Sequence, residues 1–230
     1  MLYVFGDSFA NGFGILPDYA HINLVAKVFK TEIKNLGFLG SSLEYTFTKF
    51  EEQRNNFIED DIIIIMLTML DKTHFFPDRP NISGPWSFSE FTNYSIDERN
   101  ALELYYDKLH NSTNNVINLY NFLHSVQDTT VRKKCETVIF HSFDSYYNNS
   151  INNERYPDLH IAKGNLWFNM KREIRDVDLL NHYTEHHFVN DPRILHFSKQ
   201  NHFILANSIV SAIRNNTEID LDNIILENIY

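Results

Sequence analysis

The sequence predicts an α/β domain in which helices cover a mainly parallel sheet. Short apolar runs alternate with longer segments whose apolar residues follow helical spacing. The most apolar run, Ile62 to Leu67, has no alternation of polar and apolar residues, as expected for a strand buried on both faces. A chain of 230 residues fits one such domain with a sizeable core, and no internal repeat or long linker divides it. We therefore expect a single domain over residues 1–230.

Apolar runs and helical spacing set the expected order of elements. Strands are expected, in a sheet of about five, over Leu2 to Phe5, Glu32 to Leu36, Ile62 to Leu67 and Glu136 to Phe140. Helices are expected over Asn23 to Phe29, from a Ser41-Ser42 cap towards Phe57, over Asp97 to Val126 with a break near Asn111 to Asn115, over Asp176 to His187, and from a Ser198 cap through Ile213.

In two regions, the apolar residues follow neither the pattern of a strand nor the spacing of a helix. Lys72 to Ser95 mixes prolines with aromatic residues, and Asp144 to Asn165 is rich in Asn and Tyr. Long irregular stretches beside strand ends are more often functional than filler. The aromatic residues of the first region suit a sugar-stacking or acyl-binding wall, with core packing or a hydrophobic lid as the alternative. The acidic, amphipathic tail over residues 215–230 is expected to pack on the body.

Composition and charge exclude several classes of protein. The net charge of −10 argues against binding to nucleic acid, which requires a basic face. A hydrophobic content of 43% excludes a disordered chain. The Ile62 to Leu67 run is too short to span a bilayer, so no membrane partner is expected. A candidate strand from residue 2 leaves no room for a leader, which predicts a cytoplasmic protein, with a virion or phage-encoded origin as the alternative.

Serine and histidine stand at opposite ends of the chain. Ser8 follows the first expected strand in the turn Gly6-Asp7-Ser8, where parallel sheets bind ligands. His196 precedes the last expected helix. A serine early and a histidine late can form a nucleophile–base pair. The alternatives are that Asp7-Ser8 caps a helix and that His196 is structural.

A glycine turn supplies a third candidate element. Gly40 follows the second expected strand, in the segment Asn35-Leu36-Gly37-Phe38-Leu39-Gly40-Ser41. Its backbone N–H, together with that of Ser8, can form an oxyanion hole. An ordinary glycine turn is the alternative.

Taken together, three blocks resemble the SGNH hydrolases, also called the GDSL family of lipases and esterases. GDSF resembles that family's first block, NLGFLGSS its second, and HFSKQNHFILA its last, which often reads HPSxxGHxxxA. The resemblance implies that Ser8 is the nucleophile, Gly40 an oxyanion donor and His196 the base. It also implies a flavodoxin-like three-layer α/β/α sandwich with a mainly parallel five-stranded sheet, and it implies no cofactor.

The chain departs from the family pattern at two positions. The family's GxND asparagine, an oxyanion donor, has no counterpart after the third strand, where Thr68 is the proposed substitute. The acid that usually lies three residues before the histidine is replaced by Arg193, which leaves Asp191 as the nearest carboxylate. Asp191 or a backbone carbonyl would then orient the His196 ring.

The resulting expectation is a serine-dependent hydrolase of a small-molecule or glycan ester, such as a carbohydrate O-acetyl group. The alternative is a weak or inactive glycan-binding module of a larger assembly. A nucleotide-binding flavodoxin-like protein is less well supported, because the chain lacks a glycine-rich phosphate loop.

Three further sets of residues have weaker interpretations. His182 and His186 are four residues apart, as on one helical face, but no other ligands complete a metal site, so no metal is expected. His202 is expected in the first turns of the last helix, outside direct contact with substrate. Cys135 is expected to be a buried strand residue rather than a reactive thiol.

Overall fold

The computed structural model describes residues 1–11, 16–38, 40–70, 95–109, 112–142, 151–164, 166 and 199–221. Within them five parallel strands form one sheet in the order β2-β1-β3-β4-β5. The strands are β1 (Leu2–Phe5), β2 (Ile33–Asn35), β3 (Ile62–Leu67), β4 (Glu136–His141) and β5 (His160–Ile161). This is the order of flavodoxin-like, doubly wound sheets. The α/β class and the parallel sheet are therefore confirmed.

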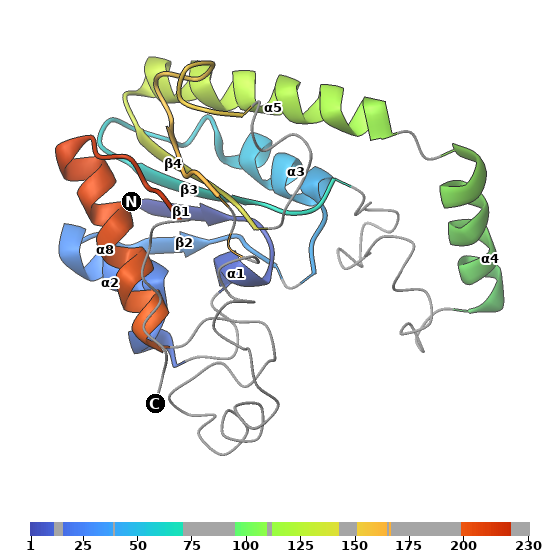
Figure 1. Cartoon of the computed structure of the whole chain (residues 1–230), viewed down its shortest axis with the longest axis horizontal. Coiled ribbons are helices and arrows are strands. Elements are labelled where there is room, and N and C mark those ends of the chain that lie inside the picture. The colour runs from blue at the N-terminus through green and yellow to red at the C-terminus, as the bar shows by residue number, and fades with distance from the viewer. Residues whose placement is uncertain are drawn as a thin grey trace.

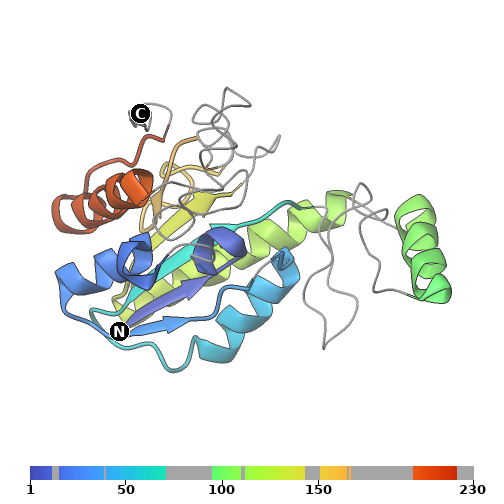
Figure 2. The same cartoon turned by 90° about the horizontal axis from the view of Figure 1, so that it is seen from below.

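Helices cover both faces of this sheet (Figure 1). They are α1 (Ser8–Asn11), α2 (His21–Phe29), α3 (Leu43–Gln53), α4 (Ile96–Leu104), α5 (Ser112–Lys133) and α8 (Lys199–Asn215), with a 3₁₀ turn η1 (Pro17–Tyr19) and a π-helical segment η3 (Tyr105–Leu109). Figure 2 shows α2 and α8 on one face and α3 and α5 on the other, with α4 away from the sheet. Among the described helices, none is both long and apolar enough to cross a bilayer.

Alternating strand residues feed two separate cores. Val4, Ile64 and Phe140 pack with residues of α2 and α8, whereas Phe5 and Ile65 pack with residues of α3 and α5. Successive strand side chains point to opposite faces, so a strand covered on both faces must be apolar throughout. All six residues of β3 are buried, which explains its unbroken apolar run.

The boundaries of two helices differ from those expected. The cap at Ser42 is confirmed, because its side chain accepts a hydrogen bond from the Tyr45 N–H, but α3 ends at Gln53 instead of continuing towards Phe57. The expected end of the next long helix at Val126 is wrong, since α5 continues to Lys133. Its last turns carry polar residues, and these hide the apolar spacing.

The fifth strand lies in a region that was expected to be irregular. Strand β5 has two residues, His160–Ile161, which is too short for any periodicity to be visible in the sequence. The expected helix over residues 176–187 and the cap at Ser198 lie outside the described residues, as does the irregular region over 72–95 except for its last residue, Ser95.

The start of the C-terminal tail contacts the body beside β5. Ile219 and Leu221 are buried in the core on the α2/α8 face. The Lys163 N–H donates to the Ile219 carbonyl at 2.8 Å, and the Leu221 N–H donates to the Lys163 carbonyl at 2.9 Å. Residues 222–230 lie outside the described part.

Candidate active site

The candidate residues of the first three strands meet at one edge of the sheet. Because the strands are parallel, the segments after β1, β2 and β3 all lie at their carboxyl ends. After β1 the chain passes to α2 on one face, and after β3 it passes to α5 on the opposite face. The carboxyl edge between β1 and β3 is therefore a topological switch point, where sheets of this kind bind ligands.

Gly6 shapes the turn that carries Ser8. Its φ of 134° lies in the region that favours glycine, and a Cβ there would lie 2.5 Å from the Met66 carbonyl oxygen. Asp7 Oδ1 accepts a hydrogen bond from the Phe9 N–H at 3.0 Å and so caps the start of α1. The capping interpretation is therefore correct for Asp7, while Ser8 is the half-buried first residue of α1.

A serine that was not among the predicted site residues connects β4 to this turn. The Ser142 N–H donates to the Leu67 carbonyl at 2.8 Å, and its Oγ donates to Asp7 Oδ1 at 3.3 Å. Both Asp7 and Ser142 are completely buried. The ends of β1, β3 and β4 are thus held together by one polar connection. A polar residue directly after an apolar strand was the available signal for Ser142.

The loop that contains Gly40 is bonded to the turn that contains Ser8. The Gly6 carbonyl accepts hydrogen bonds from the Phe38 N–H and from Ser41 Oγ, each at 2.9 Å. Gly40 has a φ of 72°, so this position also favours glycine. The structure therefore brings together the two loops that contain the predicted oxyanion donors, Ser8 and Gly40.

Thr68 lies one residue beyond β3, at the switch point. It is 6% exposed, and its Oγ1 is buried without a hydrogen-bond partner among the described residues. Such a hydroxyl is uncommon in folded proteins and is costly unless something bonds to it. Its position and its unused hydrogen-bonding capacity suit contact with a bound oxygen atom.

His141 is a second buried polar residue at this edge that was not among the predicted site residues. It ends β4, and in the sheet register it lies opposite Leu67. Burial lowers the pKa of His141 from 6.5 to about 4, so the ring is neutral at pH 7. Its Nε2 has no partner among the described residues. The available signal was a histidine at the end of an otherwise apolar strand.

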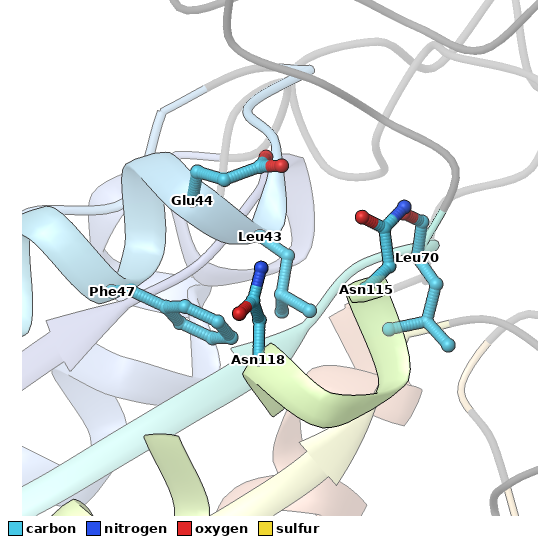
Figure 3. A pocket seen from close by; sticks show the side chains of 6 residues that line it. All are labelled: Leu43, Glu44, Phe47, Leu70, Asn115 and Asn118. Atoms are coloured by element: carbon cyan, nitrogen blue, oxygen red, sulfur yellow. The ribbon is translucent and has the colours of Figure 1, made fainter. Parts of the chain in front are cut away.

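A small cavity lies between α3, α5 and the segment after β3 (Figure 3). Its volume is about 10 Å³, and its lining is Leu43, Glu44, Phe47, Leu70, Asn115 and Asn118. A cavity of this size holds about one water molecule. It is too small for a sugar ring, so it does not identify the binding site of a substrate.

The two predicted residues from the late part of the chain, His196 and Asp191, lie outside the described residues, as do His182 and His186. Their roles remain predictions. In the described part of the chain, no cluster of three or more His, Cys, Asp or Glu side chains is arranged to hold a metal ion.

Cys135 lies directly before β4, at the opposite edge of the sheet from Ser8. Its side chain is buried and its Sγ donates to the Ile58 carbonyl at 3.3 Å. Burial is the main cause that raises the pKa of the thiol to about 11, so the reactive thiolate is scarce at neutral pH. The expected burial of Cys135 is confirmed, but its expected place in a strand is wrong, because β4 begins one residue later, at Glu136.

The fold and the edge geometry define the chain as a doubly wound α/β protein with polar groups gathered at its switch point. Comparison with protein-family models matches no family, and comparison with curated proteins finds no significant similarity.

Proposed function

We propose that this protein is a serine-dependent ester hydrolase of the SGNH type, acting on a small-molecule or glycan ester such as a carbohydrate O-acetyl group. Ser8 is the nucleophile and His196 is the general base. The backbone N–H groups of Ser8 and Gly40, with the Thr68 hydroxyl, stabilise the oxyanion.

The observation that carries the proposal is the joining of two loops at the switch point. The Gly6 carbonyl binds both Phe38 and Ser41, so the segments on either side of Ser8 and Gly40 are fixed to each other. An oxyanion hole requires such preorganised donors, since donors that must reorganise during the reaction contribute less.

The start of α8 supports His196 as the partner of Ser8. The His21 N–H at the start of α2 donates to His202 Nδ1 in α8 at 3.3 Å. Helix α2 begins at the carboxyl edge of the sheet, because it returns the chain from the end of β1 to the start of β2. Lys199 begins α8 and is three residues after His196, a separation that the backbone limits to about 11 Å.

In the proposed reaction, Ser8 Oγ attacks the ester carbonyl carbon while His196 accepts the hydroxyl proton. The oxyanion of the tetrahedral intermediate accepts hydrogen bonds from Ser8 N–H, Gly40 N–H and Thr68 Oγ1. Collapse breaks the bond to the alkoxy oxygen, and His196 protonates the departing alcohol. A water molecule, deprotonated by His196, then attacks the acyl carbon. The bond to Ser8 Oγ breaks, His196 returns the proton to Ser8 Oγ, and the acid is released. Asp191 is the proposed carboxylate that orients His196.

The test compares Ser8→Ala with Ser208→Ala, a matched control in the middle of α8. The substrates are p-nitrophenyl acetate and an O-acetylated oligosaccharide, with a fluorophosphonate probe for the nucleophile. We expect turnover and labelling to disappear in Ser8→Ala and to persist in Ser208→Ala. A wild-type protein that is neither labelled nor active would overturn the proposal.

A second candidate function is glycan binding without catalysis, and the replacement of the family's asparagine by Thr68 favours it. It predicts binding of the O-acetylated oligosaccharide, measured by calorimetry, with no labelling of Ser8 and no turnover. His196→Ala separates the two functions further. The hydrolase should lose most of its turnover while its unfolding transition changes little, whereas a binding module should keep its affinity.

A further inference from the structure

Two buried histidines join the first turns of α2 and α8. His21 is 1% exposed and His202 is 5% exposed. Their rings stack with an interplanar angle of 8°, and the two Nδ1 atoms are 3.0 Å apart. These residues, here called the histidine pair, are separated by 181 positions in the sequence.

The hydrogen bonds of the pair fix its protonation pattern. His202 Nδ1 lies 3.3 Å from the His21 backbone nitrogen, which is a donor, so His202 Nδ1 must be an unprotonated acceptor. The His21 Nδ1–H is then the donor in the contact between the rings. Both rings are neutral in this arrangement, with His202 protonated at Nε2 and His21 Nε2 unprotonated.

His202 also completes the amino terminus of α2. The residue at the N-cap position, Ala20, has no side chain that can accept a hydrogen bond, and a helix leaves its first N–H groups without internal partners. His202 Nδ1 supplies an acceptor from another helix. A protonated His202 could not accept this bond, and its charge would face the positive end of the helix dipole.

Among the described residues, the charged side chains of the surrounding elements pair with one another or lie over aromatic rings. Asp18 of η1 pairs with Lys27 of α2 at 2.8 Å on the surface. In α8, the Lys199 Nζ lies 3.7 Å from the centre of the Tyr19 ring, and Arg214 lies over the ring of Phe29. Burial and the neighbouring His202 both hold the pKa of His21 well below 6.5.

We propose that the histidine pair is an acid-sensitive clamp that holds the first turn of α8 against α2 at neutral pH and releases it on protonation. The clamp itself follows from the contacts between His21 and His202 and does not depend on the proposed function. Its consequence for catalysis rests on the proposed function, because the segment that carries His196 leads directly into α8. Release of that turn would lower esterase activity in acid.

The size of the effect follows from linkage. A histidine that is neutral in the closed state and has its ordinary pKa of about 6.5 in the open state favours opening about tenfold at pH 5.5. Hydrogen exchange read by mass spectrometry over residues 199–206 and 20–25, at pH 7.5 and 5.5 and corrected for intrinsic rates, measures this opening. We expect protection in the wild type to fall at least about tenfold between these pH values.

The key variant is His21→Asn/His202→Asn. Asparagine places an amide donor or acceptor near the position of Nδ1 but does not titrate, so protection should fall less than about twofold. His141→Gln is the matched control, because it removes another buried histidine. In this variant, protection over residues 199–206 should still fall between pH 7.5 and 5.5 as much as in the wild type. The clamp would be contradicted if protection in the wild type did not fall between these pH values, or if protection in the double variant fell as much as in the wild type.

A measurement on the wild-type protein keeps the proposal testable if the double variant does not fold. Nitrogen-15 NMR of the rings at pH 7.5 should show His202 unprotonated at Nδ1 and His21 protonated at Nδ1, and a proton on His202 Nδ1 would overturn the proposal. Neither readout requires enzymatic activity, so failure of the clamp and failure of the proposed hydrolase are distinguishable.

Discussion

The two edges of the sheet accommodate buried polar groups differently. At the amino ends of β3 and β4, Asp61 Oδ2 accepts from the Ile58 N–H at 2.9 Å and the hydroxyls of Thr130 and Thr137 bond at 2.7 Å. In the adjoining helix α5, Thr129 Oγ1 is buried without a partner among the described residues. At the carboxyl edge, Thr68 Oγ1 and His141 Nε2 are buried without partners among the described residues.

Paired polar groups at the strand ends stabilise the fold, whereas unpaired ones lower its stability. A buried polar group without a partner costs about 1–3 kcal/mol, whereas a paired group contributes modestly to stability. Stability alone would favour the arrangement of the amino edge at both ends. The unpaired groups at the switch point are in keeping with ligand contact there and with the proposed position of the active site.

The largest expected loss of stability comes from adding a side-chain carbon to Gly6, at the carboxyl edge of the sheet. Gly6→Ala places a methyl group against the Met66 carbonyl and requires a backbone conformation that alanine rarely adopts. We expect the free energy of unfolding in urea to fall by about 2–4 kcal/mol. Gly37→Ala is the control, since Gly37 has no positive φ, and it should change stability much less. Equal effects of the two variants would contradict the described turn.

The second-largest effect is a pH dependence of the free energy of unfolding, caused by His141 at the carboxyl edge. Because the pKa of His141 is about 4 in the folded state and about 6.5 in the unfolded state, its contribution is complete above pH 6.5 and is lost as the pH falls towards 4. This corresponds to about 2 kcal/mol of stability between pH 7.5 and 5.0. Urea unfolding of His141→Gln should show an acid-induced loss smaller by that amount. A loss equal to that of the wild type would place the ring in contact with water.

Two buried threonines offer a matched pair of variants. Thr137→Val removes a hydroxyl that is bonded to Thr130, so stability should fall by about 1 kcal/mol without a change in esterase activity. Thr68→Val removes an unpaired hydroxyl, so stability should stay constant or rise by up to about 1 kcal/mol.

The activity of Thr68→Val tests the proposed oxyanion contact. The rate constant kcat should fall about 10²- to 10³-fold if Thr68 donates to the oxyanion. Turnover equal to that of the wild type would remove Thr68 from the proposed mechanism while leaving the roles of Ser8 and Gly40 intact.

The smallest effect is expected at Cys135, on the amino edge. The pKa of this thiol is raised from 9.0 to about 11 on folding, so its contribution is complete below pH 9 and is lost as the pH rises. In Cys135→Ala, the free energy of unfolding should fall less steeply as the pH rises above 9. Its dependence on pH between 5 and 8 should stay the same as in the wild type. Rapid labelling of native Cys135 by a thiol reagent at pH 7.5 would contradict its burial.

The sequence predicted the parts of the fold that depend on local pattern. Strand β3 was visible as a continuous apolar run, and α8 as apolar residues at helical spacing. Strand β5 was not, because two residues carry no period. The contact between His21 and His202 was also beyond prediction, since tertiary packing alone brings positions so far apart in the chain together.

The candidate site was predicted in the same partial way. Glycines at strand ends indicated the turns at Gly6 and Gly40, and both have the positive φ that such turns require. The bonds that join these turns through the Gly6 carbonyl depend on the relative positions of two strands, which no local pattern encodes. His196 and Asp191 remain predictions.

The contact between Lys163 and the tail has a consequence for association between molecules. Unpaired edge strands recruit strands from other chains and promote aggregation. Beside β5, the backbone of residues 219–221 already occupies hydrogen-bonding groups of Lys163, while at the opposite edge β2 is three residues long and carries Lys34. Truncation before Ile219 would expose the first of these edges, and the shortened protein should then self-associate at concentrations at which the intact chain does not.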